Sequence, residues 1–324
     1  EFLLQNGYVT TEAVSRRYRS PLYLTDRGRE VFAALQARIA SMEDAASMGL
    51  TEYDQAVEYF TQALELSDGW VQNVDYDMNY YLAAAYTKNG QPAEAKKVYD
   101  AILGLKPEEK DAYFLRGSAE LELGDYESAK ADFDQAISMD PKNYDRLIEI
   151  YEALAAHGYR EVGQEYLQNV LDTAKQLDAY DSGRIYYYLG EYQKAYLALD
   201  EARDKGGADS CLYLGRAYAA TGDYNYASSV YNNYLSKQGP NAEIYNELGL
   251  CEMAKKEYQN ALAAFQAGKQ IEGNSLMQTL CFNEIVAYEY LEDYQQAEVL
   301  MNAYLQNYPD DQTAIREQQF LSTR

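Results

Sequence analysis

Residues Gly124 to Phe133 read GDYESAKADF, and this phrase recurs along the chain. Its general form is Gly-Asp-Tyr-x-x-Ala-x-x-x-(Phe/Tyr), and a looser copy, GEYQKAYLAL, begins at Gly190. We use the small residue at the sixth position of the phrase as a register mark. Eight marks follow one another at spacings of 39, 34, 34, 32, 32, 34 and 36 residues: Ala56, Ala95, Ala129, Gly163, Ala195, Ala227, Ala261 and Ala297. Self-similarity at such a period indicates an array of stacked units.

Each unit reads as two antiparallel helices. Four positions after every mark stands a large apolar residue: Phe60, Tyr99, Phe133, Leu167, Leu199, Tyr231, Phe265 or Met301. Twelve positions before the mark, five units have a small residue: Ala83, Gly117, Gly183, Gly215 and Gly249. A small residue lets two helices approach closely, and a bulky residue one turn later fills the space beside it. We therefore expect small residues to face small residues where the two helices of a unit cross.

Turn-forming residues separate these helices. A residue with positive φ is expected to end the first helix of a unit at Gly90, Gly124, Gly190 and Gly222. Proline cannot continue a helix, and it follows the second helix at Pro107, Pro141, Pro240 and Pro309. After the last proline, residues 312–320 read as a closing helix with Ile315 and Phe320 inward and Gln318 and Gln319 outward.

Residues 38–310 resemble an array of tetratricopeptide repeats, which are helix-turn-helix units of about 34 residues. The best copy, residues 110–142, fills all the signature positions: Tyr113, Gly117, Gly124, Tyr126, Ala129, Phe133, Ala136 and Pro141. The unit marked by Gly163 departs most, with Arg160 in place of Tyr and Leu167 in place of the aromatic residue. The resemblance implies an all-α, right-handed superhelix of about eight repeats over residues 38–310, followed by a capping helix in residues 311–324.

Residues 1–37 differ in composition from the repeats. Before residue 40 there are six Arg and four acidic residues, whereas the remainder has 22 basic and 48 acidic residues. Residues 8–11 and 21–25 read as short strands joined by a basic loop, so we expect a β-hairpin with Arg16, Arg17 and Arg19 at its tip.

Residues 2–50 resemble the wing half of a MarR-type winged-helix domain, most specifically in LTDRGRE from Leu24. This resemblance implies that Arg17 and Arg19 are wing residues near a DNA minor groove. It also implies a dimer-forming helix from Asp26, which leaves a homodimer open. The alternative is that the hairpin only caps the first repeat.

Composition excludes several classes of protein. The chain has 28 Lys and Arg against 52 Asp and Glu, and this net charge of -24 repels phosphate backbones, so broad nucleic-acid binding is not expected. One His and the lack of a nucleophile, base and orienter set predict that the protein is not an enzyme and has no cofactor or metal site. The three Cys are too far apart for a zinc or disulfide framework and are expected to be free, buried thiols.

The chain lacks a run of about 18 apolar residues and a basic-then-apolar N-terminal segment, which predicts a cytoplasmic protein without a transmembrane segment. Because it begins at Glu1 and not at Met, a removed signal and a place in the bacterial cell envelope remain the alternative.

In tetratricopeptide arrays the first helices line a concave groove. Carried over to this chain, the resemblance implies a peptide-binding groove formed by Tyr180, Arg184, Tyr187, Tyr188, Leu212, Arg216 and Asn246. Arg184 and Arg216 hold the same position in adjacent units, so two guanidiniums would converge on one carboxylate of a ligand, with tyrosines supplying flat contact area. The alternative is that each Arg pairs with nearby acidic residues of the chain itself.

These features predict a non-enzymatic scaffold that binds a protein or peptide, with an acidic group on the ligand, in the groove of the superhelix. Two other functions remain open. One is a peptide-sensing transcriptional regulator with a truncated winged-helix domain, and the other is a bacterial cell-envelope lipoprotein that carries the repeats.

Overall fold

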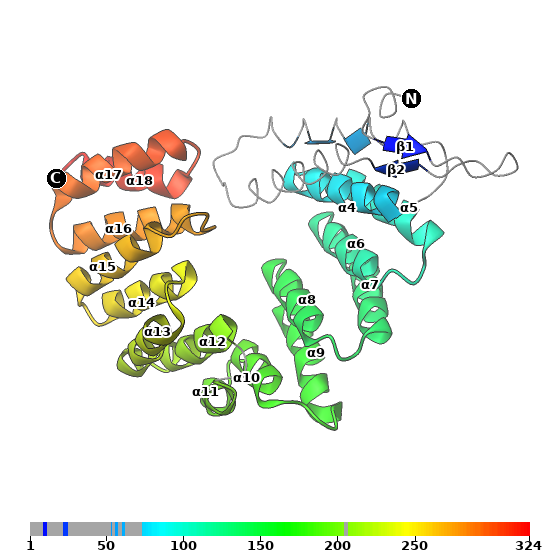
Figure 1. Cartoon of the computed structure of the whole chain (residues 1–324), viewed down its shortest axis with the longest axis horizontal. Helices are drawn as coiled ribbons and strands as arrows, with labels where there is room; N and C mark the ends of the chain where they lie inside the picture. Colours follow the sequence, from blue (N-terminus) through cyan, green and yellow to red (C-terminus); the bar gives the residue numbers. More distant parts are fainter. Residues whose placement is uncertain are drawn as a thin grey trace, which may run out of the picture. The chain divides into compact units, whose positions relative to one another are not determined.

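The computed structural model describes residues 73–203 and 207–324, the strands at 9–11 and 22–24, and helical residues at 53, 56–57 and 60–61 (Figure 1). Described first helices of the repeats are α4 (Asn73–Lys88), α6 (Lys110–Glu122), α8 (Tyr144–Ala156), α10 (Ala179–Tyr188), α12 (Gly207–Ala220), α14 (Ala242–Ala254) and α16 (Met277–Tyr290). The matching second helices are α5 (Pro92–Leu105), α7 (Tyr126–Met139), α9 (Arg160–Thr173), α11 (Tyr192–Glu201), α13 (Tyr224–Gln238), α15 (Tyr258–Lys269) and α17 (Tyr294–Asn307). Helix α18 (Gln312–Leu321) follows them.

The register marks occupy one structural position. In each second helix from α5 to α17 the mark is the fourth residue, and every mark described is buried. The large residue four positions later is buried as well, from Phe60 to Met301. The all-α repeat fold expected from the sequence is therefore confirmed, because the period of the sequence is also the period of the helix pairs.

The chain divides into two compact units, residues 1–160 and 161–324. In the first unit, consecutive helices from α4 to α8 pack against each other, and in the second the same holds from α10 to α18. The division falls at the first residue of α9, in the repeat marked by Gly163, the repeat that departs most from the signature. The proposed division into residues 1–37, 38–310 and 311–324 remains a prediction.

A left-handed backbone conformation ends each first helix, five residues before the mark. It is found at Gly90, Gly124, Gly190 and Gly222, as expected, and also at Gly158, Lys256 (φ 65°) and Glu292 (φ 61°). The turn lets the next backbone N–H bond back to the helix, as where the Glu257 N–H donates to the Glu252 carbonyl at 2.9 Å. The last two repeats therefore make the same turn without glycine.

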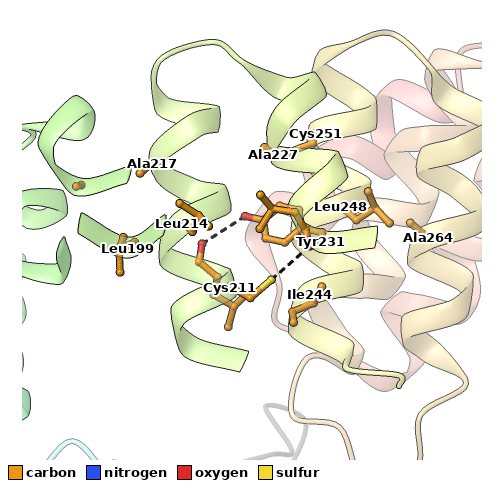
Figure 2. Packing of buried hydrophobic residues seen from close by; sticks show 13 residues of the cluster. Leu199, Cys211, Leu214, Ala217, Ala227, Tyr231, Ile244, Leu248, Cys251 and Ala264 are labelled. Atoms are coloured by element: carbon orange, nitrogen blue, oxygen red, sulfur yellow. Dashed lines mark hydrogen bonds between the residues drawn. The ribbon is translucent and has the colours of Figure 1, made fainter. Parts of the chain in front are cut away.

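Packing within a repeat differs from the small-on-small contact that we expected. The small residue of the first helix lies mainly against the large residue of the second helix, as Gly215 lies against Tyr231, although Gly117 also approaches the backbone of its mark Ala129. Figure 2 shows Tyr231 in the core between α12 and α14, with its hydroxyl donating to the Leu212 carbonyl at 3.5 Å. The reason is the length of the large side chain, which lies one turn beyond the mark and reaches across to the backbone of the first helix.

The closing helix exists as expected, but its buried face is different. In α18 the buried residues are Ala314 and Leu321, whereas Phe320 is exposed and Ile315 is half-buried. Ala314 and Leu321 are seven residues apart, two helical turns, and so lie on the side that packs against α17. The expectation of an inward Phe320 was wrong, because it was based on the size of the apolar residues and not on the spacing of two helical turns.

Near the N-terminus, β1 (Val9–Thr11) pairs antiparallel with β2 (Leu22–Leu24), with Val9 opposite Leu24. The expected tip with Arg16, Arg17 and Arg19 lies outside the described residues, and so does the helix expected from Asp26. The complete hairpin and the winged-helix resemblance therefore remain predictions.

Candidate functional site

The residues predicted to line a groove belong to three first helices of the second unit. Tyr180, Arg184, Tyr187 and Tyr188 lie on α10, Leu212 and Arg216 on α12, and Asn246 on α14. Side chains link these helices to one another. The Tyr188 hydroxyl lies 3.0 Å from that of Tyr213 on α12, and the Asn246 amide oxygen accepts a hydrogen bond of 2.8 Å from Asn283 on α16.

Arg184 is held within its own helix. Its side chain is buried, Nη2 donates to Oδ1 of Asp181 at 2.6 Å, and the guanidinium carbon lies 4.4 Å from the centroid of the Tyr180 ring. A buried charge needs a partner of this kind, because an unpaired one would be costly to desolvate. The charge of Arg184 is thus compensated by Asp181 in the first turn of α10.

Arg216 joins two neighbouring first helices. Its Nη2 donates to Oε1 of Glu247 at 2.8 Å and to Oε1 of Glu243 at 2.9 Å, both on α14. Burial lowers the pKa of Arg216, but Glu247 and Glu243 outweigh burial and raise it. The pairing of both arginines with acidic residues of the chain, foreseen as the alternative, is present in the structure.

The tyrosines of the predicted groove pack on one another. The Tyr187 ring centroid lies 5.4 Å from that of Tyr188, 5.8 Å from that of Tyr192 and 5.6 Å from that of Tyr213. Burial raises the pKa of Tyr187. These rings are half-buried, so only part of each ring is open to a ligand.

Leu212 and Asn246 are less accessible than the resemblance implied. Both are buried, Leu212 as part of the core cluster around Tyr231 and Asn246 in its amide pair with Asn283. They therefore support the surface more than they form it.

Two exposed apolar side chains on the same set of helices were not predicted. Leu250 on α14 is 42% exposed, and Tyr290 on α16 is 58% exposed. Leu250 follows Asn246 by four residues, and Tyr290 follows Asn283 by seven, so each lies on the same side of its helix as that asparagine. Because the two asparagines are hydrogen-bonded to each other, Leu250 and Tyr290 belong to neighbouring parts of one surface. Extending the groove positions into the last repeat would have found Phe282, Val286 and Tyr290.

We call the surface formed by Tyr188, Arg216, Glu243, Leu250, Val286 and Tyr290 the first-helix face. It runs over α10, α12, α14 and α16, and hydrogen bonds between neighbouring first helices make it continuous within the second unit. It combines apolar side chains with carboxylates, which suits recognition of another polypeptide more than chemistry on a small molecule.

The remaining reactive groups have structural partners. His157 ends α8, with Nδ1 2.8 Å from the Ala153 carbonyl oxygen. Cys211 and Cys251 are buried as expected, and burial raises the pKa of each to about 12, whereas Cys281 is only partly buried. Within residues 73–203 and 207–324, no three His, Cys, Asp or Glu are grouped so as to hold a metal ion.

The fold and this face define a helical-repeat protein with a surface suited to a polypeptide. Models of the tetratricopeptide repeat family match residues 80–144 and 212–274, and a second model of that family matches residues 46–68. The chain is a tetratricopeptide repeat protein. The matches fall on both compact units, as the register marks require.

Individual relatives are distant. The photosystem I assembly protein Ycf3 of Cyanophora paradoxa is 29% identical over 140 residues, which are 38% of this chain and 75% of that protein. A tetratricopeptide repeat protein from Parabacteroides merdae has a solved structure that covers 82% of this chain and 97% of its own, with a TM-score of 0.48 and 14% identity. PilW, a type IV pilus biogenesis factor, covers 78% of this chain and 99% of its own, with a TM-score of 0.44 and 16% identity.

In the part of the chain that the structure describes, no helix is both long and apolar enough to cross a membrane.

Proposed function

We propose that this protein is a non-enzymatic scaffold that binds a segment of another protein on the first-helix face. The observation that carries the proposal is the exposure of Leu250 and Tyr290 on neighbouring first helices. Burying apolar side chains of this kind contributes roughly 25 cal/mol per Å² of apolar area. Membership of the tetratricopeptide repeat family supports the proposal, because stacked helical repeats create extended surfaces for binding other polypeptides.

Two other strongly exposed apolar residues, Leu197 and Val299, do not form such a surface. Leu197 on α11 is 67% exposed and Val299 on α17 is 58% exposed, but each stands on a second helix of a different repeat. Isolated apolar side chains on a surface are ordinary. Leu250 and Tyr290 differ from them because the half-exposed Phe282 and Val286 lie beside them on the same pair of helices.

That the ligand carries an acidic group which binds Arg184 and Arg216 remains a separate proposal. A ligand carboxylate on Arg184 would compete with Asp181, and one on Arg216 would compete with Glu243 and Glu247. The tyrosines, Arg216 and Asn246 stay candidate contacts because they lie on or directly beneath the first-helix face.

A set of fluorescently labelled peptides of about 16 residues, long enough for two or more repeats, tests the proposal by anisotropy titration with the whole 324-residue chain. The double variant Leu250→Ala/Tyr290→Ala should weaken binding at least about tenfold, since it removes two apolar contacts. The matched control, Leu197→Ala/Val299→Ala, truncates side chains of equal or greater exposure and should leave binding unchanged. Equal effects of the two double variants, or no binding by any peptide, would overturn the proposal.

A further inference from the structure

The charged residues of the first-helix face are mainly acidic. Helices α14 and α16 contain no Lys or Arg, but they contain Glu243, Glu247, Glu252, Glu284 and Glu289. Two of these carboxylates are neutralised from outside the face, because Glu252 pairs with Lys255 and Glu284 pairs with Lys269. Of the other three, Glu243 and Glu247 belong to the face, whereas burial and the neighbouring carboxyl of Glu317 on α18 raise the pKa of Glu289 to about 7.

Arg216 does not reverse this charge. It is the one basic residue in α12, α14 and α16, and its guanidinium already pairs with both Glu243 and Glu247. One positive charge against two leaves a net negative charge at that point. Asp209, exposed in the first turn of α12, adds a further carboxylate.

The accessible part of this charge lies beside the apolar part of the face. The side chain of Glu243 is 46% exposed, and it is on the same helix as Leu250. A ligand carboxylate would have to displace Glu243 or Glu247 from Arg216, and the displaced carboxylate would then lie beside a like charge, which is unfavourable. An ammonium or guanidinium group of a ligand would meet carboxylates without displacing anything.

We propose that the first-helix face binds a basic segment of another protein that also carries apolar residues. Its Lys or Arg side chains lie beside Asp209 and Glu243, and its apolar side chains lie on Leu250 and Tyr290. This inference rests on the proposed function and adds to it the chemistry of the partner. It reverses the sign of the ligand charge expected from the sequence.

A substitution of Arg216 distinguishes a basic ligand from an acidic one. If the ligand is basic, Arg216→Gln should tighten binding, because it removes a positive charge from the face and releases Glu243 and Glu247. If the ligand is acidic, the same variant should weaken binding. Arg316→Gln on α18 is the matched control, since it makes the same change of charge at an exposed arginine away from the face.

The probes are three labelled peptides of about 16 residues with the same leucines and with Lys, Gln or Glu at every other variable position. Each is titrated with the whole chain at low salt and at about 0.15 M salt, where charges more than about 8 Å apart are largely screened. We expect the Lys peptide to bind most tightly, and Arg216→Gln to tighten its binding by about threefold or more. Asp209→Asn/Glu243→Gln should weaken it by about three- to tenfold, whereas Glu298→Gln on α17 should not.

The outcomes distinguish this inference from the proposed function. If the Gln or Glu peptide binds most tightly and still depends on Leu250 and Tyr290, the scaffold proposal stands and the basic partner is wrong. If Glu298→Gln and Arg316→Gln change binding as much as the face variants, the attraction comes from the overall charge of the chain, and the inference is again wrong. If Leu250→Ala/Tyr290→Ala has no effect on any peptide, the scaffold proposal itself fails. Circular dichroism checks that each variant is folded, and Asp209→Asn, at an exposed position, tests the inference even if Arg216→Gln does not fold.

Discussion

Gly215 of α12 lies against the ring of Tyr231 of α13 so closely that a Cβ atom on Gly215 would come within 2.2 Å of Cζ of that ring. The relationship repeats along the chain, and the corresponding distances are 2.8 Å for Gly117 and Phe133, 2.5 Å for Gly183 and Leu199, and 2.3 Å for Gly249 and Phe265. A glycine in the first helix thus makes room for a large side chain of the second. This contact couples the two helices of a repeat.

Gly215→Ala should therefore lower the free energy of unfolding by about 1 to 3 kcal/mol, because overpacking outweighs the better helix propensity of alanine. Urea denaturation monitored by circular dichroism measures the change. Gly104→Ala in α5 is the control, since nothing lies within 4 Å of the added Cβ, and it should stabilise the protein by roughly 0.5 to 1 kcal/mol. A Gly215→Ala protein as stable as the parent would show that the ring can move aside at little cost.

Lys256→Gly and Glu292→Gly should each stabilise the protein. Both residues hold a left-handed conformation, with φ of 65 and 61, which costs a non-glycine residue roughly 1 to 2 kcal/mol. Part of that gain is lost to the greater freedom of glycine in the unfolded chain, so we expect a net gain of about 0.5 to 1 kcal/mol. The reverse change, Gly222→Ala, has open space around its Cβ and tests the backbone alone. It should destabilise the protein by a similar amount, and a stabilising effect would contradict the explanation.

Ala129→Leu should cost about 1 to 3 kcal/mol of the free energy of unfolding, because the mark of the best repeat is fully buried and its backbone oxygen would lie 3.1 Å from a Cβ on Gly117. Ala131→Leu, two residues further along α7 at an exposed position, is the control and should change stability little. If the two variants melt at the same temperature, the register of the repeats is wrong.

Glu289 should make stability depend on pH. Burial, and then the neighbouring carboxyl of Glu317, raise the pKa of Glu289 from 4.5 to about 7. Between these values the folded state holds a proton that the unfolded state has released, so the free energy of unfolding falls as pH rises. Glu289→Gln should remove this loss, and the variant should gain stability over the parent between pH 5 and pH 8. Glu298→Gln, an exposed carboxylate on α17, should follow the parent, and a Glu289→Gln variant that does so too would exclude Glu289 as the cause.

Much of the fold could be predicted because a repeat period is a local property. The position of Ala129 relative to Phe133 and to Gly124 is set within a few residues, and helix geometry then carries it into three dimensions. The buried face of the closing helix could not be predicted in this way. Its existence followed from the pattern, but whether Ala314 or Ile315 faced α17 depended on the contact with that helix.

The candidate site was less predictable for the same reason. Leu250 and Tyr290 stand at groove positions of their repeats, but the repeat pattern demands no residue type there, so which side chains stay exposed could be read only from the packed helices. Their charge environment depended on Glu243 and Glu247, whose significance is visible only once α12 and α14 are side by side.

The sequence by itself determined the number of residues between repeats, the buried face of each second helix and the left-handed turn between paired helices. These follow from helix periodicity and from steric limits that act over one or two turns. Only the tertiary structure decided that Gly215 lies against the ring of Tyr231, and that Arg216 pairs with acidic residues 27 and 31 positions away. The physical reason is that hydrogen bonds and ion pairs between helices depend on distances of about 3 Å, and such distances arise only when separate helices pack together.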